Sequence, residues 1–286
     1  MNSTVINAMQ LCYQNTQITK LVNDWHTQGK TVAFVPTMGG LHQGHLSLID
    51  IAKQKADKVI VSIFVNPAQF GKNEDLDSYP RTLNADLTVL EVNVDGVFIP
   101  DVKQIYPKGI SKHTDVGKIG QILCGKTRPH FFNGVAQVVE ILFGIVRPDV
   151  AVFGQKDYQQ LLVIKQMVKN SSLDICIESG ETIREKSGLA MSARNQYLSE
   201  NEAKIATNLY RILSYFKHEI LQNKKVDVLK QLAEFDLKQY FKLDYLEALD
   251  ANTLRQITGN THQIVILSAV FLGSVRLIDN IIFKKG

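Results

Sequence analysis

Short apolar runs separated by helical patterns organise the first 180 residues of the chain. The runs at 31–35 and 58–65 are rich in β-branched residues, which is typical of strands buried on both faces of a parallel sheet. Pro36 is expected to end the first strand, because proline cannot donate to a sheet ladder. Further strands are predicted at 96–99, 150–153 and 173–178.

Apolar residues between these runs recur three and four positions apart, which predicts amphipathic helices. Near the N-terminus Ile18, Leu21, Val22 and Trp25 follow this spacing, and Gly29 ends the pattern. Strands that alternate with helices predict an α/β fold with a Rossmann-like, doubly wound parallel sheet. Other helices are predicted at 44–56, 83–92 and 135–145.

The pattern changes near residue 180. Residues 179–199 are rich in loop-forming residues, and Ser199 with Glu202 forms a capping box for the next helix. The elements predicted beyond it are amphipathic helices at 200–220 and 226–240 and strands near 243–248, 264–271 and 275–280.

The length of 286 residues, with 45% hydrophobic content, is enough to bury a sizeable core in two domains. We expect residues 1–180 to form the Rossmann-like domain. Residues 181–286 are expected to form a smaller α+β domain that acts as a lid.

Charge and composition argue against several classes of protein. The net charge of +4 comes from acidic and basic residues mixed along the chain, so neither nucleic acid nor a membrane surface is an expected partner. The chain has no long apolar run and no secretory pattern at its N-terminus, so we expect a cytoplasmic protein. Cys12, Cys124 and Cys176 lack CxxC spacing and are expected to be buried, reduced thiols.

The turn after the first strand carries Gly39, Gly40 and Gly44 together with His42 and His45. Glycines let a backbone approach a ligand closely, and a helix that starts directly afterwards offers N–H groups to an anion. The pattern favours a phosphate site at which two imidazoles donate hydrogen bonds. Two alternatives remain: the glycines only form a turn in which one histidine caps the helix, or the histidines bind a metal, although no HExxH helix or carboxylate cluster accompanies them.

A second glycine-rich segment, at 120–127, matches the Walker A pattern of P-loop ATPases. The polar residues at 113–118 do not form a leading strand. Pro129 and Gly134 follow where an uninterrupted helix should run. The context therefore argues against a P-loop.

Polar residues follow two other predicted strands, at the sheet edge where α/β folds bind ligands. After one strand, Asn66 and Gln69 either bind a substrate or satisfy the backbone of their own turn. After the other, Lys156 suits phosphate oxygens, Asp157 a ribose hydroxyl and Gln160 a small polar substrate. The alternative for the second group is an ordinary helix N-terminus with an acidic residue in its first turn.

Residues 36–45, PTMGGLHQGH, resemble the signature of the pantothenate synthetase family, which belongs to the HxGH nucleotidyltransferase superfamily. Later segments agree with this family in order and spacing over nearly the whole chain. The resemblance implies an AMP-forming ligase that joins pantoate to β-alanine through a pantoyl adenylate. It also implies ATP as a substrate, Mg²⁺ as its companion and a homodimer.

The resemblance assigns roles residue by residue. Catalytic roles fall on His42, His45, Lys156 and Arg194, and pantoate contacts on Asn66, Gln69 and Gln160. Asp86 lies where the family can have an acidic residue near magnesium, although a surface position on its helix is the commoner case. The ATP contacts fall on Met38, Gly39, Gly40, Leu41, His42, Gln43, Gly44 and His45, on Gly154, Gln155, Lys156 and Asp157, and on Ile183 (through its backbone), Met191, Ser192, Ala193 and Arg194.

The chain departs from the family pattern at four places. His130 lies one position earlier than the family's histidine, and Gln137 replaces a threonine. Gln155 replaces a glutamate, which keeps the shape and loses the charge. Ala193 lacks a hydroxyl that the family uses at the phosphates.

Two other functions are compatible with the motifs. One is an HxGH enzyme that transfers a nucleotidyl group to a phosphorylated substrate, for which the neutral Gln69 and Gln160 are unsuited. The other is a non-catalytic nucleotide-binding module, for which Ala193 is the only indication.

Overall fold

The computed structural model describes residues 9–72, 74–110 and 114–285. The chain divides into two compact units. Unit 1 comprises Met1–Gln155 and Val163–Glu181, and unit 2 comprises Lys156–Leu162 and Thr182–Gly286. The last division, between Glu181 and Thr182, lies one residue beyond the boundary predicted after residue 180. The short segment 156–162 belongs to unit 2. The predicted division had only one boundary and therefore placed this segment in the first domain.

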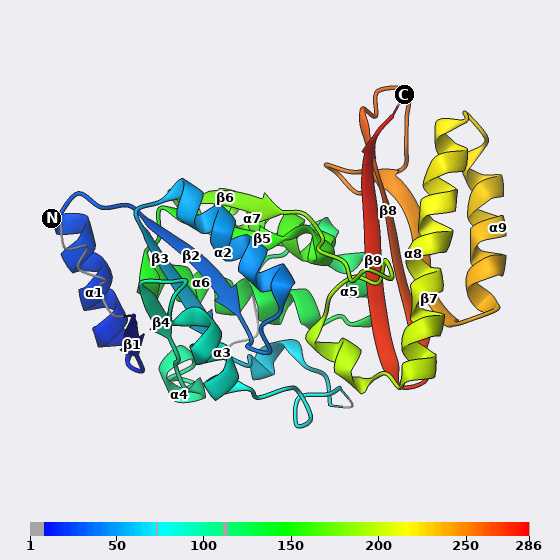
Figure 1. Cartoon of the computed structure of the whole chain (residues 1–286). Helices are drawn as coiled ribbons and strands as arrows, with labels where there is room; N and C mark the ends of the chain where they lie inside the picture. The colour runs from blue at the N-terminus through cyan, green and yellow to red at the C-terminus, as the bar shows by residue number, and fades with distance from the viewer. Residues whose placement is uncertain (1–8, 73, 111–113, 286) are drawn as a thin grey trace, which may run out of the picture. The chain divides into compact units, whose positions relative to one another are not determined.

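Unit 1 is built on a six-stranded sheet with the order β1-β4-β3-β2-β5-β6, in which neighbouring strands run parallel (Figure 1). The predicted parallel α/β sheet is confirmed. The chain adds β3 and β4 on one side of β2 and then returns to place β5 on the other side, so the strand order reverses between β2 and β5. The strands are β1 Gln10–Cys12, β2 Val32–Thr37, β3 Lys58–Ile63, β4 Gly96–Phe98, β5 Val150–Gly154 and β6 Cys176–Gly180.

Pro36 does not end its strand as predicted, because β2 continues to Thr37. The carbonyl of Thr37 accepts from Phe64 N on the β3 side, so Pro36 faces the β5 side. Pairing of β2 with β5 stops at Phe34. Proline is tolerated there because no partner strand needs its missing N–H.

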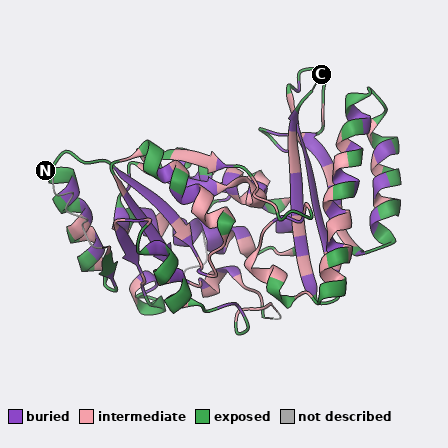
Figure 2. Ribbon diagram, in the orientation of Figure 1, coloured by how far each residue is buried: buried purple, intermediate pink, exposed green. Residues whose placement is uncertain are grey.

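Helices cover both faces of this sheet. On one face α2 and α3 bury their apolar sides against strand residues such as Val35 and Val61. On the other face Phe143 of α6 packs edge-to-face on Phe34 and on Phe153, with ring centroids 6.4 Å apart in each pair. Figure 2 shows the strands between them as the most continuously buried part of the unit. The helices are α1 Asn15–Thr27, α2 Gln43–Lys55, α3 Leu83–Leu90, α4 Val102–Ile105, α5 Cys124–Thr127, α6 Phe131–Val146 and α7 Tyr158–Asn170, with 3₁₀ turns η1 Pro67–Gln69, η2 Lys118–Gln121 and η3 Gln155–Asp157.

Unit 2 contains an antiparallel sheet with the order β7-β8-β9, and α8 and α9 pack beside each other against it (Figure 1). Its core is apolar and includes Leu209 and Phe216 of α8 and Ile266 of β8. Both predicted helices and all three predicted strands are present. Their bounds are η4 Ala193–Tyr197, α8 Glu200–Leu221, α9 Val226–Lys238, β7 Lys242–Asp250, β8 Gln263–Leu272 and β9 Val275–Lys284.

Two expectations about composition can be compared with the fold. Cys12 and Cys124 are buried free thiols, as expected, but Cys176 is exposed because it begins the edge strand β6. Among the described residues, every helix is too short or too polar to cross a membrane.

Candidate active site

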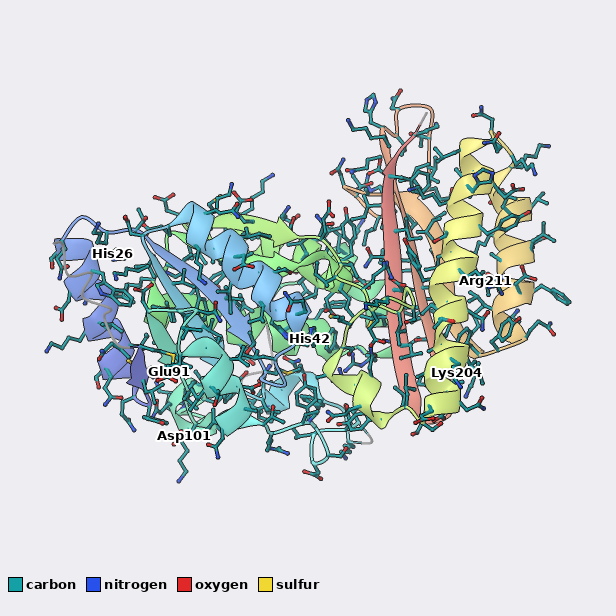
Figure 3. The ribbon with its side chains drawn as sticks, in the orientation of Figure 1. His26, His42, Glu91, Asp101, Lys204 and Arg211 are labelled. Atoms are coloured by element: carbon teal, nitrogen blue, oxygen red, sulfur yellow. The ribbon has the colours of Figure 1, made fainter. Side chains whose placement is uncertain are left out.

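The glycine turn joins the carboxyl end of β2 to α2, beside the reversal of strand order. His42 is the N-cap of α2, and Figure 3 labels it at that end of the helix. Gly39 and Gly40 have φ of +81° and +65°, which is the left-handed region that glycine adopts without a Cβ clash. The sequence therefore places glycine where the backbone conformation requires it.

Several backbone N–H groups of this turn donate hydrogen bonds within the chain. Gly39 N donates to Thr37 Oγ1 at 3.2 Å, and Gly44 N donates to His42 Nδ1 at 3.1 Å. Gly40 N and Leu41 N donate to a carboxylate. These hydrogen bonds within the chain fix the shape of the turn.

The carboxylate that receives these bonds is Asp86 of α3. Its Oδ2 accepts from Gly40 N at 3.0 Å and from Thr82 Oγ1 at 3.1 Å, and its Oδ1 accepts from Leu41 N at 2.8 Å. Asp86 is 3% exposed, so the expected surface position is wrong. Because both carboxylate oxygens hold the turn, the structure favours a positioning role over the magnesium role that the family suggested.

His42 and His45 stack with ring centroids 4.2 Å apart and planes tilted by 40°. His45 Nδ1 accepts from His42 N at 3.3 Å, while His42 Nδ1 accepts from Gly44 N. An Nδ1 that accepts a hydrogen bond carries no proton, so each neutral ring holds its proton on Nε2. One histidine does cap the helix, as the alternative interpretation held, and the capping fixes both rings as Nε2–H donors.

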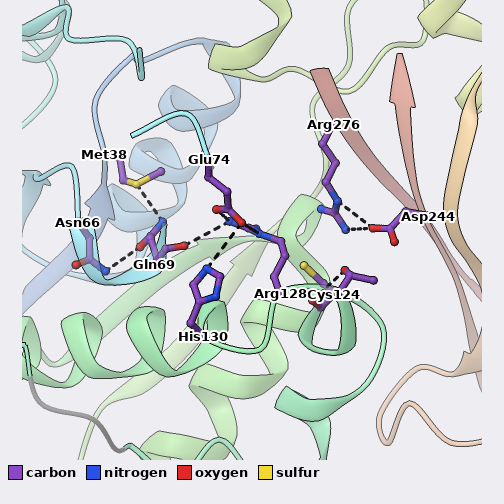
Figure 4. Close-up of polar contacts among 10 residues, drawn as sticks. Met38, Asn66, Gln69, Glu74, Cys124, Arg128, His130, Asp244 and Arg276 are labelled. Atoms are coloured by element: carbon purple, nitrogen blue, oxygen red, sulfur yellow. Dashed lines mark hydrogen bonds and ion pairs between the residues drawn. The ribbon is translucent and has the colours of Figure 1, made fainter. Parts of the chain in front are cut away.

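Asn66 and Gln69 lie at the carboxyl end of β3 in a buried chain of amide contacts (Figure 4). Asn66 Nδ2 donates to Gln69 Oε1 at 3.0 Å, and Gln69 Nε2 points to Met38 Sδ at 3.1 Å. Asn66 Oδ1 accepts from Ala68 N at 3.1 Å and from Tyr106 Oη at 2.7 Å. Asn66 is 1% exposed and uses both amide atoms internally, which favours a role in positioning Gln69.

Tyr106 is a site residue that the sequence analysis missed. Its hydroxyl donates to Asn66, which lies 40 positions away in the sequence. Burial raises the pKa of Tyr106 above the ordinary value, with the hydrogen bond to Asn66 acting in the opposite direction, so the phenol stays neutral and donates. No local sequence signal marks such a long-range partner.

Helix α6 approaches η1 closely at Gly134. The carbonyl of Gly134 accepts from Asn66 Nδ2 at 3.1 Å, and a Cβ added at Gly134 would lie 2.2 Å from the carbonyl oxygen of Ala68. Only glycine fits this position. This glycine, in the first turn of α6, is thus required to position the amides.

Glu74, which follows η1 in a polar segment of the chain, is ion-paired. Arg128 Nε donates to Glu74 Oε1 at 2.7 Å, its Nη2 pairs with Oε2, and the guanidinium lies 3.9 Å from the centroid of the Phe131 ring. His130 Nε2 lies 3.8 Å from Glu74 Oε1 (Figure 4). The displaced histidine therefore joins the cluster that anchors this loop, and Phe131 supports Arg128.

The ion pair predicts a pH-dependent contribution to stability. Burial opposes ionisation of Glu74, but Arg128 outweighs it and lowers the pKa of the carboxyl below its ordinary value. Glu74→Gln should therefore cost about 1–3 kcal/mol in the free energy of unfolding at pH 7. A lowered pKa stabilises the fold above the unfolded-state value and loses that effect as pH falls, so the cost should shrink below about pH 4.

Urea denaturation of both proteins at several pH values measures this cost. Asp77→Asn, in the same loop and with an exposed carboxylate, is the matched control and should leave stability unchanged at every pH. A Glu74→Gln cost that stayed constant down to about pH 3 would contradict the role of the ion pair.

The carboxyl end of β5 carries Gly154 and Gln155 beside the strand-order reversal. Gln155 Nε2 donates to Ser179 Oγ of β6 at 3.2 Å, so the residue that replaces the family's glutamate bridges two strand ends. Directly after it, Lys156, Asp157 and Gln160 are half-buried and belong to unit 2. The carbonyl of Lys156 accepts from Asn280 Nδ2 at 2.9 Å.

The remaining ATP candidates lie on a hairpin of unit 2. Met191 N donates to the carbonyl of Ile183 at 3.0 Å, so part of the Ile183 backbone expected at adenine is used within the hairpin. Ser192 is the N-cap of η4 and accepts from Arg194 N at 3.2 Å through its hydroxyl. The structure thus brings Ile183 near Met191 and fixes the backbone that carries Ser192, Ala193 and Arg194.

The segment at 120–127 is not a P-loop, in agreement with its sequence context. It consists of η2 and the short helix α5, and the described residues 114–117 that lead into it form no strand. A Cβ on Gly125 would lie 1.9 Å from the carbonyl oxygen of Gly120, so these glycines serve close backbone packing. Within the described part of the chain, no group of three or more His, Cys, Asp or Glu side chains is arranged to hold a metal ion.

Comparison with known proteins is consistent with this geometry. The family described as Pantoate-beta-alanine ligase matches residues 10–282. The chain is 90% identical over 278 residues to the pantothenate synthetase of Ruthia magnifica subsp. Calyptogena magnifica, covering 97% of this chain and 100% of that relative.

Solved structures agree with the sequence matches. Pantothenate synthetase from Thermus thermophilus superposes with a TM-score of 0.90 at 37% identity, covering 96% of this chain and 99% of that one. Pantoate-beta-alanine ligase from Francisella tularensis, complexed with beta-gamma ATP and beta-alanine, superposes with a TM-score of 0.79 at 36% identity, covering 97% and 98%. The chain therefore belongs to the pantoate–β-alanine ligase family, whose members are ligases that form a C–N bond.

Proposed function

We propose that this chain condenses pantoate with β-alanine at the expense of ATP, through a pantoyl adenylate held by the residues described above. The observation that carries the proposal is the pair of stacked imidazoles, both fixed as Nε2–H donors where the strand order reverses. The family membership supplies the reaction, and the ATP and β-alanine of the Francisella complex support the substrates.

The chemistry explains why ATP is needed. A carboxylate is a poor electrophile, so it does not condense with an amine at neutral pH. A carboxylate oxygen of pantoate attacks the α-phosphorus, and the bond to the bridging oxygen breaks to release pyrophosphate. The free amine of β-alanine then attacks the acyl carbon, AMP leaves with the bonding electrons, and the amine proton passes to solvent.

The histidines act on the first step. Charge accumulates on the α-phosphate oxygens as the carboxylate attacks, and preorganised donors stabilise that charge best when they need no rearrangement. His42 and His45 meet this condition because the helix cap fixes their tautomers. Lys156, Ser192 and Arg194 are proposed to hold the β- and γ-phosphates, and no residue forms a covalent bond.

Gln69 is proposed to hold pantoate, with Asn66 and Tyr106 fixing its amide. The same contacts disfavour a nucleotidyltransferase that acts on a phosphorylated substrate, which would need an available cation beside Gln69. Arg128 is the cation there, since its Nη2 lies 3.4 Å from the carbonyl of Gln69, but its charge is matched by Glu74. Gln160 is proposed as the second pantoate contact.

Magnesium is proposed to arrive bound to the ATP phosphates, since the oxygens of Asp86 hold the glycine turn. The homodimer follows from the family resemblance, and the cytoplasmic location and the lid role of unit 2 are expectations from the sequence; all three stay predictions.

The reaction is tested by omitting each substrate in turn from an assay that measures pyrophosphate and AMP separately. We expect both products only with ATP, pantoate and β-alanine together at turnover. Without β-alanine, pyrophosphate should appear as a single burst of about one equivalent per site, because the adenylate stays bound. Steady pyrophosphate release without β-alanine, or none with all three substrates, would contradict the proposal.

A further inference from the structure

Two adjacent residues of β9, Asp279 and Asn280, are buried polar residues to which the proposed reaction assigns no role. They are 3% and 4% exposed, in a strand whose other buried residues are mainly apolar. Burying polar groups is costly unless each finds a partner, so their contacts indicate what they serve.

Asn280 reaches the segment that begins unit 2. Its Nδ2 donates to the carbonyl of Lys156 at 2.9 Å, and its backbone N donates to Asp279 Oδ1 at 2.7 Å. The two residues of the bond to Lys156 are 124 positions apart in sequence. The main chain that carries the lysine side chain is thus tied to the centre of a rigid strand.

Asp279 reaches the hairpin that carries Ile183 and Met191. Arg184 Nη1 and Nη2 donate to the two oxygens of Asp279 at 2.7 and 2.8 Å, in a bidentate pair. Arg184 also donates to the carbonyl of Asn280 at 3.2 Å and stacks 3.8 Å from the centroid of the Tyr210 ring.

The same guanidinium closes its own hairpin. Its Nη1 donates to the carbonyl of Gly188 at 3.1 Å, and Arg184 pairs with Ala190 in an isolated antiparallel bridge. Gly188 has φ of +90°, and a Cβ there would lie 2.8 Å from the Tyr210 ring. The hairpin therefore has one shape, and Asp279 holds it through Arg184.

We infer that Asp279 and Asn280 are positioning residues for ATP. Asn280 sets the main chain at Lys156, and Asp279 sets the hairpin of Ile183 and Met191. One strand thereby fixes the distance between the phosphate-binding lysine and the hairpin that receives the nucleoside. This inference rests on the proposed role of Lys156.

The test compares Asn280→Ala with the wild-type enzyme. Loss of one neutral hydrogen bond that positions Lys156 should raise KM for ATP and lower kcat/KM for ATP by about five- to tenfold, with KM for pantoate unchanged. Asn280→Leu keeps the side-chain size but has no hydrogen-bond donor, so it should lower kcat/KM for ATP by a similar factor. It replaces Asn280→Ala in the test if the alanine variant folds poorly. Ser268→Ala is the matched control, because Ser268 is equally buried in β8 and donates to a backbone carbonyl, that of Tyr245, at 3.1 Å.

A double-mutant cycle with Lys156→Ala separates positioning from a general structural role. If Asn280 acts through Lys156, Asn280→Ala should have little further effect on kcat/KM for ATP once the lysine is gone. An equal fold-loss in both backgrounds, or the same loss in Ser268→Ala, would overturn the inference. If Lys156→Ala lowers kcat/KM for ATP but Asn280→Ala does not, the positioning role of Asn280 is wrong and the role of Lys156 stands. If Lys156→Ala leaves kcat/KM for ATP unchanged, the role of Lys156 is wrong and the inference fails with it.

Discussion

His45→Ala is expected to lower kcat by roughly a hundred- to thousandfold, which corresponds to the removal of one preorganised donor from the charge that develops on the α-phosphate. The His45 ring is held by the hydrogen bond from His42 N to its Nδ1, so its Nε2–H group is already oriented before the reaction. The rate of pantoyl adenylate formation in a single turnover, measured with saturating pantoate and β-alanine, reports the attack on the α-phosphate directly. An unchanged rate in folded protein would count decisively against the histidine role.

The same substitution removes a helix cap, and its control must separate the two effects. His45 is the N3 residue of a capping box, so alanine should also cost about 1 kcal/mol of stability. Glutamate at this position restores an acceptor for His42 N, as in the usual capping box, but places a negative charge near the phosphates. His45→Glu should therefore regain the stability lost in His45→Ala while remaining at least as slow.

The sheet was predictable from sequence where strands were long enough to show a pattern. After Lys58 the run 58–65 is apolar except for Ser62, which is expected when both faces of a strand are covered, and helices do cover both faces of this sheet: α2 packs on Val61, and α6 packs on Phe34 of β2. Strands β1 and β4 have three residues each; β4 was predicted at 96–99, whereas β1 was missed. The strand end predicted at Pro36 was wrong because proline is tolerated where β5 no longer pairs with β2. The extent of that pairing depends on the tertiary structure and not on the local sequence.

The sequence indicates the motif residues of the candidate site more readily than the contacts that hold them. Spacing selected His42 and His45 directly, whereas Gln69 was assigned to pantoate by the family resemblance. The sequence left open whether Asn66 binds substrate or satisfies its own turn, and in the structure its amide and the N–H of Gly40 have partners inside the protein. Some of the hydrogen-bond partners in this site are 40 or more positions apart in the sequence, as Tyr106 is from Asn66 and Asp86 from Leu41. A single sequence does not show that such residues are paired.

This division suggests how the site is built. Residues proposed to touch ATP or pantoate lie in short motifs, and the residues that hold them lie on other elements: Asp86 on α3, Tyr106 after α4 and Asn280 on β9. A reacting group held within a fraction of an ångström needs such supports, because small displacements cost large factors in rate. The supports should then be detectable by mutation although none of them is proposed to touch a substrate.

Asp86→Asn is the strongest test of a support. The change keeps the size of the side chain but replaces one oxygen with an NH₂ group, which then faces a backbone or hydroxyl donor among Gly40 N, Leu41 N and Thr82 Oγ1. We expect a loss of about 2–4 kcal/mol in the free energy of unfolding, because a buried donor is left unpaired. The turn that leads into His42 loosens as well, so kcat should fall about tenfold to a hundredfold.

Thr82→Val is the matched control, since it removes only the hydroxyl bond to Asp86 and should cost about 1 kcal/mol with kcat unchanged. Magnesium titration distinguishes the positioning role from the metal role that the family suggests. A positioning carboxylate predicts that the defect of Asp86→Asn persists at every magnesium concentration. A variant of wild-type stability whose kcat is restored by excess magnesium would instead identify Asp86 as a metal ligand, and the glycine turn would have to be held by its remaining contacts, Thr37 to Gly39 and His42 to Gly44.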